Sequence, residues 1–234
     1  MNRVIDIGNT RIKVAYFGKE GLIKLNYPDN EASLWEEIEA KEGPCILSTV
    51  RKTKVPALKN KVFELNSRLS LPFKSEYKSM ETLGQDRIGL AAAAAIQFPE
   101  KDVLVIDAGT CSTYDLITKS VYQGGIISPG FQMRARAMHE LTGKLPMTQA
   151  EDLPQGFLGR TTKECIALGA YGSFSWEMDF WIKSFLEQYP ELFIVLTGGD
   201  AIRFENPSNY SIFADPNFLV KGLNEILKYN ASAF

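Results

Sequence analysis

Short apolar runs separated by glycine and polar turns dominate the start of the chain. Residues 4–7, 12–17 and 22–27 are rich in β-branched and aromatic side chains, which is typical of strands, and the short turns between them predict a meander. Alternating helical and extended patterns then follow. Helices are predicted at 31–41 and 86–98, and strands at 44–50 and 62–65.

The same order of elements begins again after residue 100. Three strands with glycine-rich corners are predicted first, and helices alternating with strands come after them. The predicted strands are 103–107, 112–118, 120–127, 192–197 and 211–214, and the predicted helices are 132–142, 162–188 and 217–228. An internal duplication of an α/β unit is the simplest explanation. No Pro/Ser/Gly-rich linker lies near Glu100, so we expect two closely coupled lobes, 1–100 and 101–234.

One short phrase occurs in both halves, as VIDIGNT from Val4 and as VIDAGT from Val105. An apolar strand that ends in Asp-x-Gly places a carboxylate, here Asp6 or Asp107, at the end of a sheet, and the glycine allows a tight turn. A polyphosphate would be repelled by such carboxylates unless a cation lay between them. The phrase therefore predicts Mg²⁺ held by carboxylate, water and phosphate. Each copy alone is also ordinary hairpin-turn chemistry, but two copies in matching positions favour a function.

Polar donors follow both carboxylates, and a third glycine corner lies further along the chain. Asn9, Thr10 and Thr110 offer side-chain and backbone donors that suit phosphate oxygens. The apolar run at 193–197 leads directly into Gly198-Gly199-Asp200, a corner against which a flat group such as adenosine could lie. Neither GxxxxGK[ST] nor a GxGxxG between strand and helix occurs. If the protein binds ATP, we expect two glycine hairpins to do it.

Composition narrows the class of protein. The net charge of −2 gives no electrostatic reason to expect nucleic acid or an anionic membrane as the main partner. No apolar stretch approaches the roughly 18–20 residues needed to span a bilayer, and Asp6 interrupts any signal-peptide core. Cys45, Cys111 and Cys165 show no CxxC spacing, which indicates reduced thiols in a cytoplasmic protein and no zinc site. His139 is the only histidine, which argues against a histidine triad or a multi-histidine metal site.

The ordered set DIGNT, DAGT and GGD resembles the acetate kinase, sugar kinase, Hsp70 and actin superfamily. Within it, three segments resemble the signatures of type III pantothenate kinase: GQDRIGLAAAA from Gly84, GGIISPGFQMRARAM from Gly124 and GRTTKECIALGAYGS from Gly159. The resemblance extends from Asp6 to about Asp200, and the G-x-D-R segment is specific to this family. It implies an α/β fold of two ribonuclease-H-like lobes, each a mixed sheet that starts with a three-stranded meander, with flanking helices and an ATP cleft between the lobes. It also implies ATP-dependent phosphorylation of pantothenate to 4'-phosphopantothenate, the first step of coenzyme A biosynthesis, by a cytoplasmic homodimer.

The resemblance further implies two ATP-binding loops. The first phosphate loop would consist of Asp6, Ile7, Gly8, Asn9, Thr10, Arg11, Ile12 and Lys13. Asp6 would organise Mg²⁺ through water, and Asp107 would hold a monovalent cation, K⁺ or NH₄⁺. Thr110 would contact ATP, and Gly198 and Gly199 would adjoin the adenosine.

The residues matched to pantothenate binding come from three segments. They are Tyr77, Gly84, Gln85, Asp86, Arg87 and Thr162. Asp86 would accept the proton of the pantothenate hydroxyl, although an aspartate at a helix start is often only a cap. Arg87 would grip the pantothenate carboxylate or the moving phosphoryl group, with a solvated surface charge as the alternative. Gln85 occupies a variable position of G-x-D-R and is expected to be harmless.

Three further patterns lie in the second half. Thr161 and Thr162 are expected to cap the helix that follows, and Arg134 and Arg136 to lie on the wet face of theirs. Phe174, Met178, Trp181 and Phe185 fall on one helical face, while Trp176 and Phe180 point elsewhere. A second apolar stripe predicts a dimer interface, with plain core packing as the alternative.

Two other functions stay open from the sequence. The protein could be a kinase of the same superfamily with another small substrate, such as a sugar or acetate. It could also be an ATP-binding regulator without catalysis. Intact Asp86, Asp107 and glycine hairpins argue against the second.

Overall fold

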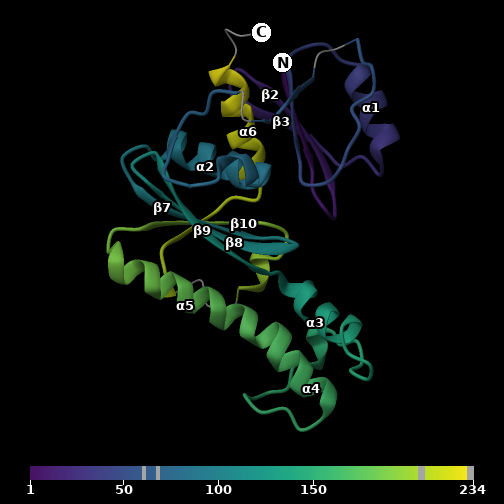
Figure 1. The fold of residues 1–234 in the computed structure, drawn as a ribbon, viewed down its shortest axis with the longest axis vertical. Helices are drawn as coiled ribbons and strands as arrows, with labels where there is room; N and C mark the ends of the chain where they lie inside the picture. The colour runs from purple at the N-terminus through teal and green to yellow at the C-terminus, as the bar shows by residue number, and fades with distance from the viewer. Residues whose placement is uncertain (60–61, 67–68, 205–208, 231–234) are drawn as a thin grey trace. The chain divides into compact units, whose positions relative to one another are not determined.

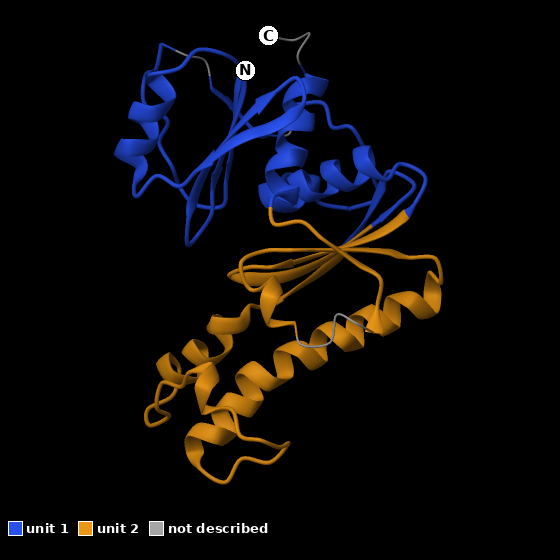
Figure 2. Cartoon of the chain, turned by 180° about the vertical axis from the view of Figure 1, so that it is seen from behind, with its two compact units in different colours: residues 1–101, 117–124, 217–234 blue, residues 102–116, 125–216 orange. Residues whose placement is uncertain are grey.

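The computed structural model describes residues 1–59, 62–66, 69–204 and 209–230 (Figure 1). The chain divides into two compact units (Figure 2). The first contains residues 1–101, 117–124 and 217–234, and the second contains residues 102–116 and 125–216. These units are defined by contacts, whereas the lobes 1–100 and 101–234 were predicted from the repeated order of elements. The lobes therefore stay a prediction.

The first sheet is mixed and has the order β3-β2-β1-β4-β5. Its strands are β1 (Asn2–Ile7), β2 (Ile12–Gly18), β3 (Gly21–Asn26), β4 (Cys45–Thr49) and β5 (Val62–Glu64). The antiparallel β1–β2 pair and the parallel β1–β4 pair place Asp6 opposite both Lys13 and Ser48. The predicted meander and the two predicted strands that follow it are confirmed.

Helices cover this sheet on both faces. On one face, Leu34 and Ile38 of α1 (Glu31–Glu39) pack with Ile5, Ile7 and other side chains of β1, β2 and β4. The helices α2 (Gln85–Gln97) and α6 (Phe218–Tyr229) contact β4, and α6 also contacts β1. Because side chains alternate along a strand, Asp6 lies on the face opposite to Ile5 and Ile7.

The helices α2 and α6 cross with almost no side chain between them. A Cβ added to Gly222 would lie 1.8 Å from the carbonyl oxygen of Gly89, so glycine at this position allows the two backbones to touch. The amide of Asn2 also donates a hydrogen bond to Asn224 (3.0 Å), which ties α6 to β1. The C-terminal helix therefore supports the helix that begins with the G-x-D-R segment.

The second sheet has the order β11-β10-β7-β8-β9-β6. Its strands are β6 (Lys74–Ser75), β7 (Asp102–Ala108), β8 (Cys111–Thr118), β9 (Val121–Pro129), β10 (Phe193–Thr197) and β11 (Ile212–Ala214). Apart from β6, which the sequence did not predict, this sheet repeats the strand order of the first one. Parallel pairing places Asp107 opposite Thr197, much as Asp6 lies opposite Ser48.

The helices of the second unit are α3 (Phe131–Glu140), α4 (Thr162–Ala167) and α5 (Ser173–Gln188). Phe174, Met178 and Ile182 of α5 pack with Leu104 and Ile106 of β7, and this layer forms the core of the unit. The predicted helix 162–188 is helical throughout, but the turn η3 (Leu168–Gly172) is π-helical rather than α-helical. No helix in the described ranges is long and apolar enough to cross a membrane.

Short 3₁₀ turns complete the described chain. They are η1 (Met80–Thr82), η2 (Ala150–Asp152) and η4 (Ala201–Arg203). The turn η1 lies just before α2 and η4 just after the Gly198-Gly199 corner, so two of the three adjoin predicted site segments.

Candidate active site

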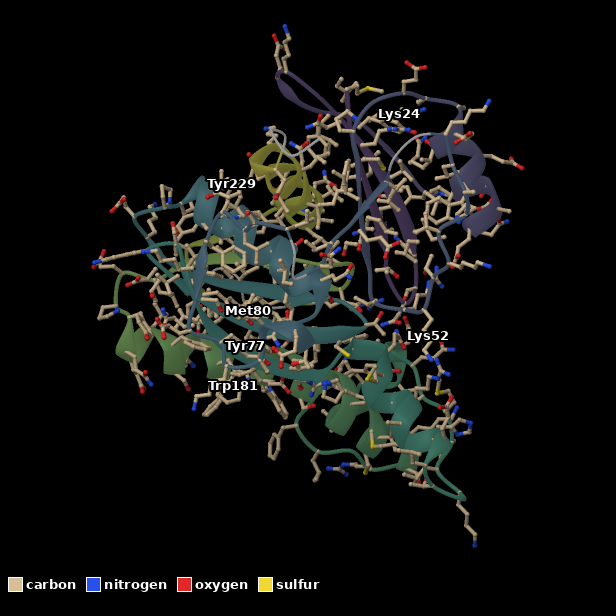
Figure 3. All side chains as sticks on the ribbon, turned by 45° about the horizontal axis from the view of Figure 1, so that its top comes forward. Lys24, Lys52, Tyr77, Met80, Trp181 and Tyr229 are labelled. Atoms are coloured by element: carbon tan, nitrogen blue, oxygen red, sulfur yellow. The ribbon has the colours of Figure 1, made fainter. Side chains whose placement is uncertain are left out.

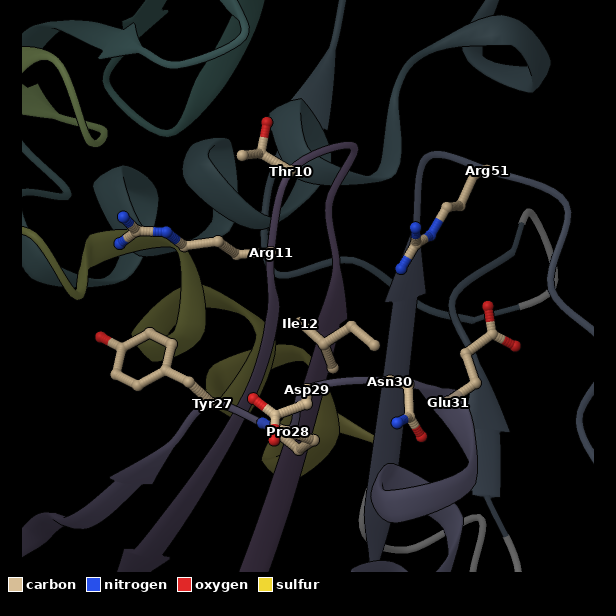
Figure 4. Close-up of a pocket in the computed structure, with 9 residues that line it drawn as sticks. All are labelled: Thr10, Arg11, Ile12, Tyr27, Pro28, Asp29, Asn30, Glu31 and Arg51. Atoms are coloured by element: carbon tan, nitrogen blue, oxygen red, sulfur yellow. The ribbon is translucent and has the colours of Figure 1, made fainter.

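The predicted first phosphate loop is the hairpin between β1 and β2. The Gly8 N–H donates to the Arg11 carbonyl (3.0 Å) and closes the turn, which leaves Asn9, Thr10 and Arg11 exposed. Beside it lies a pocket of about 690 Å³ (Figure 4). The pocket is lined by Thr10, Arg11, Ile12, Tyr27, Pro28, Asp29, Asn30, Glu31 and Arg51.

Asp6 is buried at the end of β1, with 6% of its surface exposed. Burial raises the pKa of its carboxyl to about 6, the charge of Lys13 lowers it, and the charge of Asp86 raises it. The first unit thus brings Asp6, Lys13 and Asp86 within electrostatic reach of one another. Ile7, by contrast, is a core side chain, so only its backbone is available to a ligand.

The surroundings of Asp6 fit a cation. Its carboxylate is poorly solvated and has a second carboxylate nearby, and a divalent ion would relieve both penalties. Among residues 1–59, 62–66, 69–204 and 209–230, no three His, Cys, Asp or Glu side chains are placed to hold a metal ion together. Water and phosphate oxygens would therefore supply most ligands of an ion bound at Asp6, which is the usual coordination of Mg²⁺.

The G-x-D-R segment forms the start of α2. Gly84 occupies the cap position, and Oδ1 of Asp86 accepts a hydrogen bond from the Arg87 N–H (2.9 Å) within the first turn. Asp86 is therefore not the N-cap residue of α2, as the alternative to a catalytic role had it. A Cβ added to Gly84 would lie 2.5 Å from Oδ1 of Asp86, so the absence of a side chain at Gly84 makes room for this carboxylate.

Gln85 attaches this segment to the first sheet. Its Oε1 accepts a hydrogen bond from the Thr49 N–H (2.7 Å) at the end of β4. Since β4 pairs with β1 beside Asp6, the contact links the helix of Asp86 to the strand neighbouring Asp6. No pattern in the sequence predicts this contact, because the partner is a backbone amide on a distant strand.

Arg87 and Tyr77 lie together in the first unit. Arg87 is only 4% exposed, so the alternative of a solvated surface charge is wrong. Its guanidinium carbon lies 5.9 Å from the centre of the Tyr77 ring. Tyr77 and Met80 belong to the segment between β6 and α2 (Figure 3). The Ser75 hydroxyl shapes this segment by accepting from the Tyr77 N–H (3.1 Å) and donating to the Met80 sulfur (3.0 Å).

The predicted second phosphate loop lies between β7 and β8 and is packed against the GGD corner. The Asp200 N–H donates to the Ala108 carbonyl (2.9 Å). Gly198 has a φ of +96°, and a Cβ there would lie 2.5 Å from Oδ1 of Asp107. The second unit thus brings together Asp107 and Gly198, two residues assigned to ATP and its cations.

Thr110 and Gly199 are exposed beside these residues. No atom lies within 4 Å of the position that a Cβ of Gly199 would take, so this corner has open space for a flat group. Gly130, which begins α3, packs on the other side of the loop: a Cβ there would lie 2.3 Å from the Gly109 carbonyl oxygen and 2.4 Å from that of Thr110.

Thr162 is the first residue of α4 and is exposed. The cap itself is Thr161, whose hydroxyl accepts from the Glu164 N–H (3.2 Å) while the Glu164 carboxylate accepts from the Thr161 N–H. Thr162 belongs to the second unit and the G-x-D-R segment to the first.

Arg134 does not lie on a wet face. Its side chain is 13% exposed and forms an ion pair with Glu177 (2.6 Å), which also accepts from the hydroxyls of Tyr114 and Ser128. Burial and the adjacent Glu177 raise the pKa of Tyr114 far above its ordinary value. The expectation failed because α3 packs against α4 and η3. Arg136 does lie on the exposed face, paired with Glu140.

The two mixed sheets with flanking helices form an α/β fold, as predicted. A Baf family protein from Campylobacter jejuni has a similar structure, with a TM-score of 0.66 and 23% identity over 98% of this chain and 99% of that one. The activator of 2-hydroxyisocaproyl-CoA dehydratase from Clostridium difficile, solved with bound ADPNP, gives a TM-score of 0.55 at 10% identity, covering 99% of this chain and 96% of that one. At these identities the likeness shows the fold alone.

Sequence comparison defines the family within this class. The model of the type III pantothenate kinase family matches residues 4–183, and the chain belongs to this family. A type III pantothenate kinase of Christiangramia forsetii is 41% identical over 98% of this chain and 99% of its own length. One of Bacteroides fragilis is 39% identical over 98% of each chain.

Proposed function

We propose that this protein transfers the γ-phosphoryl group of ATP to the primary hydroxyl of pantothenate, giving 4'-phosphopantothenate for coenzyme A biosynthesis. One observation carries the proposal: the carboxylate of Asp86 in the family-specific G-x-D-R segment lies within electrostatic reach of Asp6 in the first phosphate loop. A proton acceptor for the substrate and a phosphate loop are thus neighbours in one unit.

Asp86 is the catalytic residue of this proposal. Phosphoryl transfer has a loose transition state, so the acceptor mainly orients the hydroxyl and takes its proton late. A carboxylate can do this without a large pKa shift, provided that it reaches the hydroxyl. The Arg87 N–H donates to Oδ1 of Asp86, and we assign the other carboxylate oxygen, Oδ2, to the substrate hydroxyl.

The ATP-binding role is assigned to Asp6–Lys13, Thr110, Gly198 and Gly199. Exposed donors of the β1–β2 hairpin and the Lys13 ammonium would bind phosphate oxygens. Asp6 would hold Mg²⁺ through water, and the ion would supply charge neutralisation for the phosphates. Asp107 would hold K⁺ or NH₄⁺ beside Thr110.

The pantothenate-binding role is assigned to Tyr77, Gly84, Gln85, Arg87 and Thr162. Arg87 offers planar paired N–H donors that match a carboxylate, the one charged group of pantothenate. Gly84 lets the backbone approach the substrate, and Gln85 keeps the segment attached to β4.

We assign a homodimer and a cytoplasmic location to the same proposal. Trp176 and Phe180 of α5 are each 58% exposed, which supports burial of this face against a second copy. Cys45, Cys111 and Cys165 are all free thiols, as a reducing compartment requires.

An ADP-release assay tests the function. We expect activity only with pantothenate, ATP, Mg²⁺ and a monovalent cation, K⁺ or NH₄⁺. Asp86→Asn should lower kcat by about 10²–10⁴-fold, the usual contribution of a positioned acid or base. Glu81→Gln, an exposed change on the neighbouring η1, is the matched control and should leave the rate unchanged.

Three outcomes would contradict the proposal. Turnover of Asp86→Asn near the wild-type rate would remove Asp86 from the mechanism. Faster turnover of a sugar or acetate in a substrate panel would indicate another kinase of the superfamily. ATP binding without phosphorylation of any substrate would indicate a regulator.

A further inference from the structure

The pocket beside the first phosphate loop contains an arginine that no motif in the sequence singled out. Arg51 lies two residues after β4, the parallel neighbour of β1, and its side chain is exposed. Thr10, Arg11 and Ile12 of the β1–β2 hairpin line the same pocket of about 690 Å³. Figure 4 shows the Arg51 guanidinium directed toward the middle of the lining residues, whereas the Arg11 side chain extends away from it. The predicted phosphate loop and a cationic side chain from another strand thus share one pocket.

Hydrogen bonds fix the backbone that carries Arg51. The Val50 N–H donates to the Ile7 carbonyl (3.2 Å), directly before the turn at Gly8. The Thr49 hydroxyl donates to the Arg51 carbonyl (2.9 Å) and accepts from the Arg51 N–H (3.3 Å). Because β1 and β4 are parallel, both turns lie at the same edge of the sheet, and the carboxyl ends of parallel strands are where α/β proteins bind their ligands.

The same turn is also attached to the helix that carries Asp86. The Thr49 N–H donates to Oε1 of Gln85 (2.7 Å), the residue that precedes Asp86. Thr49 therefore connects the turn of Arg51 to the start of α2, while Val50 connects it to the end of β1. In the proposed function, one of these segments binds the phosphoryl donor and the other binds the acceptor hydroxyl.

The charges around the pocket restrict the group that Arg51 can bind. Within residues 1–59, 62–66, 69–204 and 209–230, its guanidinium takes part in no hydrogen bond or ion pair. The planar donors of a guanidinium match phosphate oxygens. Asp29 and Glu31 line the same pocket and would repel a bare anion, but ATP reacts as its Mg²⁺ complex, which carries less negative charge.

We propose that Arg51 binds the terminal phosphate of ATP in this pocket and adds a contact to those of the first phosphate loop. The inference rests on the proposed function, because it takes ATP as the phosphoryl donor. An arginine that neutralises the charge of the transferred phosphoryl group is a recurring part of phosphoryl-transfer sites. Here that arginine comes from the turn after β4.

Titration calorimetry without pantothenate tests the contact, with Mg²⁺–ATP and Mg²⁺–ADP as the two probes. ADP lacks the terminal phosphate. Arg51→Gln should therefore weaken the binding of ATP by about tenfold, the usual size of a hydrogen bond to a charged group, and leave the binding of ADP within about twofold of the wild type. With pantothenate present, the same variant should raise KM for ATP and leave KM for pantothenate unchanged.

Two further variants separate a contact from a change of net charge. Lys52→Gln removes a neighbouring exposed cation that does not line the pocket, and it should leave both nucleotide affinities unchanged. Arg51→Lys keeps the charge without the planar pair of donors and should restore only part of the ATP affinity. Because both side chains are exposed, all three variants should unfold at the wild-type temperature.

Three results would overturn the inference while the proposed function stands. An unchanged ATP affinity of Arg51→Gln would make Arg51 an ordinary surface charge. An equal loss for ATP and ADP would remove the assignment to the terminal phosphate. An equal loss of ATP affinity in Lys52→Gln would replace the contact by a general electrostatic effect. A wild-type protein that binds ATP and does not phosphorylate pantothenate would instead refute the proposed function, and the titrations would still decide the role of Arg51.

Discussion

The two copies of the Asp-x-Gly corner share a sequence and a strand order but differ in their surroundings. The first corner is closed by its own hairpin bond from Gly8 to Arg11, and a Cβ on Gly8 would meet only the Arg11 carbonyl at 3.3 Å. The second is enclosed by neighbouring elements. Gly130 at the start of α3 and Gly198 after β10 pack directly against its backbone, and the Asp200 N–H donates a hydrogen bond to the Ala108 carbonyl.

The chemistry differs in the same way. In the first unit, the buried Asp6 has a raised pKa and lies near both Lys13 and Asp86. In the second, Asp107 lies next to the backbone of the GGD corner. The duplicated phrase therefore specifies the turn and the carboxylate in both units. The packing around each turn differs: the first corner has few neighbours and a carboxylate with a raised pKa, and the second corner is braced, that is, held by neighbouring backbone.

The largest loss of stability should come from adding one methyl group beside the second Asp-x-Gly corner. In Gly130→Ala the new Cβ would meet two backbone carbonyl oxygens at 2.3 and 2.4 Å, and no side chain can move to relieve the clash. We expect a loss of more than about 3 kcal/mol in the free energy of unfolding, measured in urea. Gly8→Ala should lose about 1 kcal/mol or less. Equal losses of stability in the two variants would contradict the conclusion that the second corner is packed more tightly than the first.

The raised pKa of Asp6 predicts that removing its charge stabilises the folded protein. Because the pKa of Asp6 is raised from 3.8 to about 6, the folded protein binds more protons than the unfolded chain between these values. Its unfolding free energy should therefore fall as the pH rises from 4 to 6. At pH 7 without metal, Asp6→Asn should raise the unfolding free energy by about 2–3 kcal/mol.

The control for this change is Glu20→Gln, an exposed substitution that should leave stability unaltered. The gain from Asp6→Asn should become small near pH 4, because the wild-type carboxyl is then protonated in the folded state and partly protonated in the unfolded chain. A gain that is the same at pH 4 and pH 7, in thermal unfolding with EDTA, would show that the charge of Asp6 is not the cause.

The smallest effect concerns the side-chain link beside the first corner. Gln85→Met removes the acceptor of the Thr49 N–H at nearly constant volume, which should lower the unfolding free energy by about 1–2 kcal/mol. The comparable link in the second corner, Asp200 to Ala108, is between backbone atoms and cannot be removed in this way. Gln97→Met, exposed at the end of the same helix, is the matched control. Equal stability of both variants would mean that the Gln85 bond contributes nothing.

Local signals in the sequence were sufficient for most of the fold. The β-rich runs with glycine-containing turns predicted both meanders, and Gly84 and the alanine run predicted α2. The spacing of residues along the sequence was not sufficient to predict contacts that depend on tertiary packing. The two-residue strand β6 is too short to show periodicity, so its pairing with β9 could not be predicted.

Charged residues illustrate the same limit. Arg87 and Arg134 were both compatible with a solvated helix face, and both are largely buried because another element covers that face. The alternation of charges along a helix gives no information about such a neighbour. The assignment of Asp86, Asp107 and Thr162 to their roles came from the resemblance to the family and stays a prediction.

The crossing of α2 and α6 at Gly89 and Gly222 has a consequence for how the protein is made. Residues 218–229 leave the ribosome after every other element that holds the first unit together. Until they emerge, the helix that carries Asp86 has one side exposed to water, and β1 lacks its covering helix. The unit should therefore complete its folding only after residues 218–229 have been synthesised, which makes the nascent protein a candidate for chaperone binding until that point.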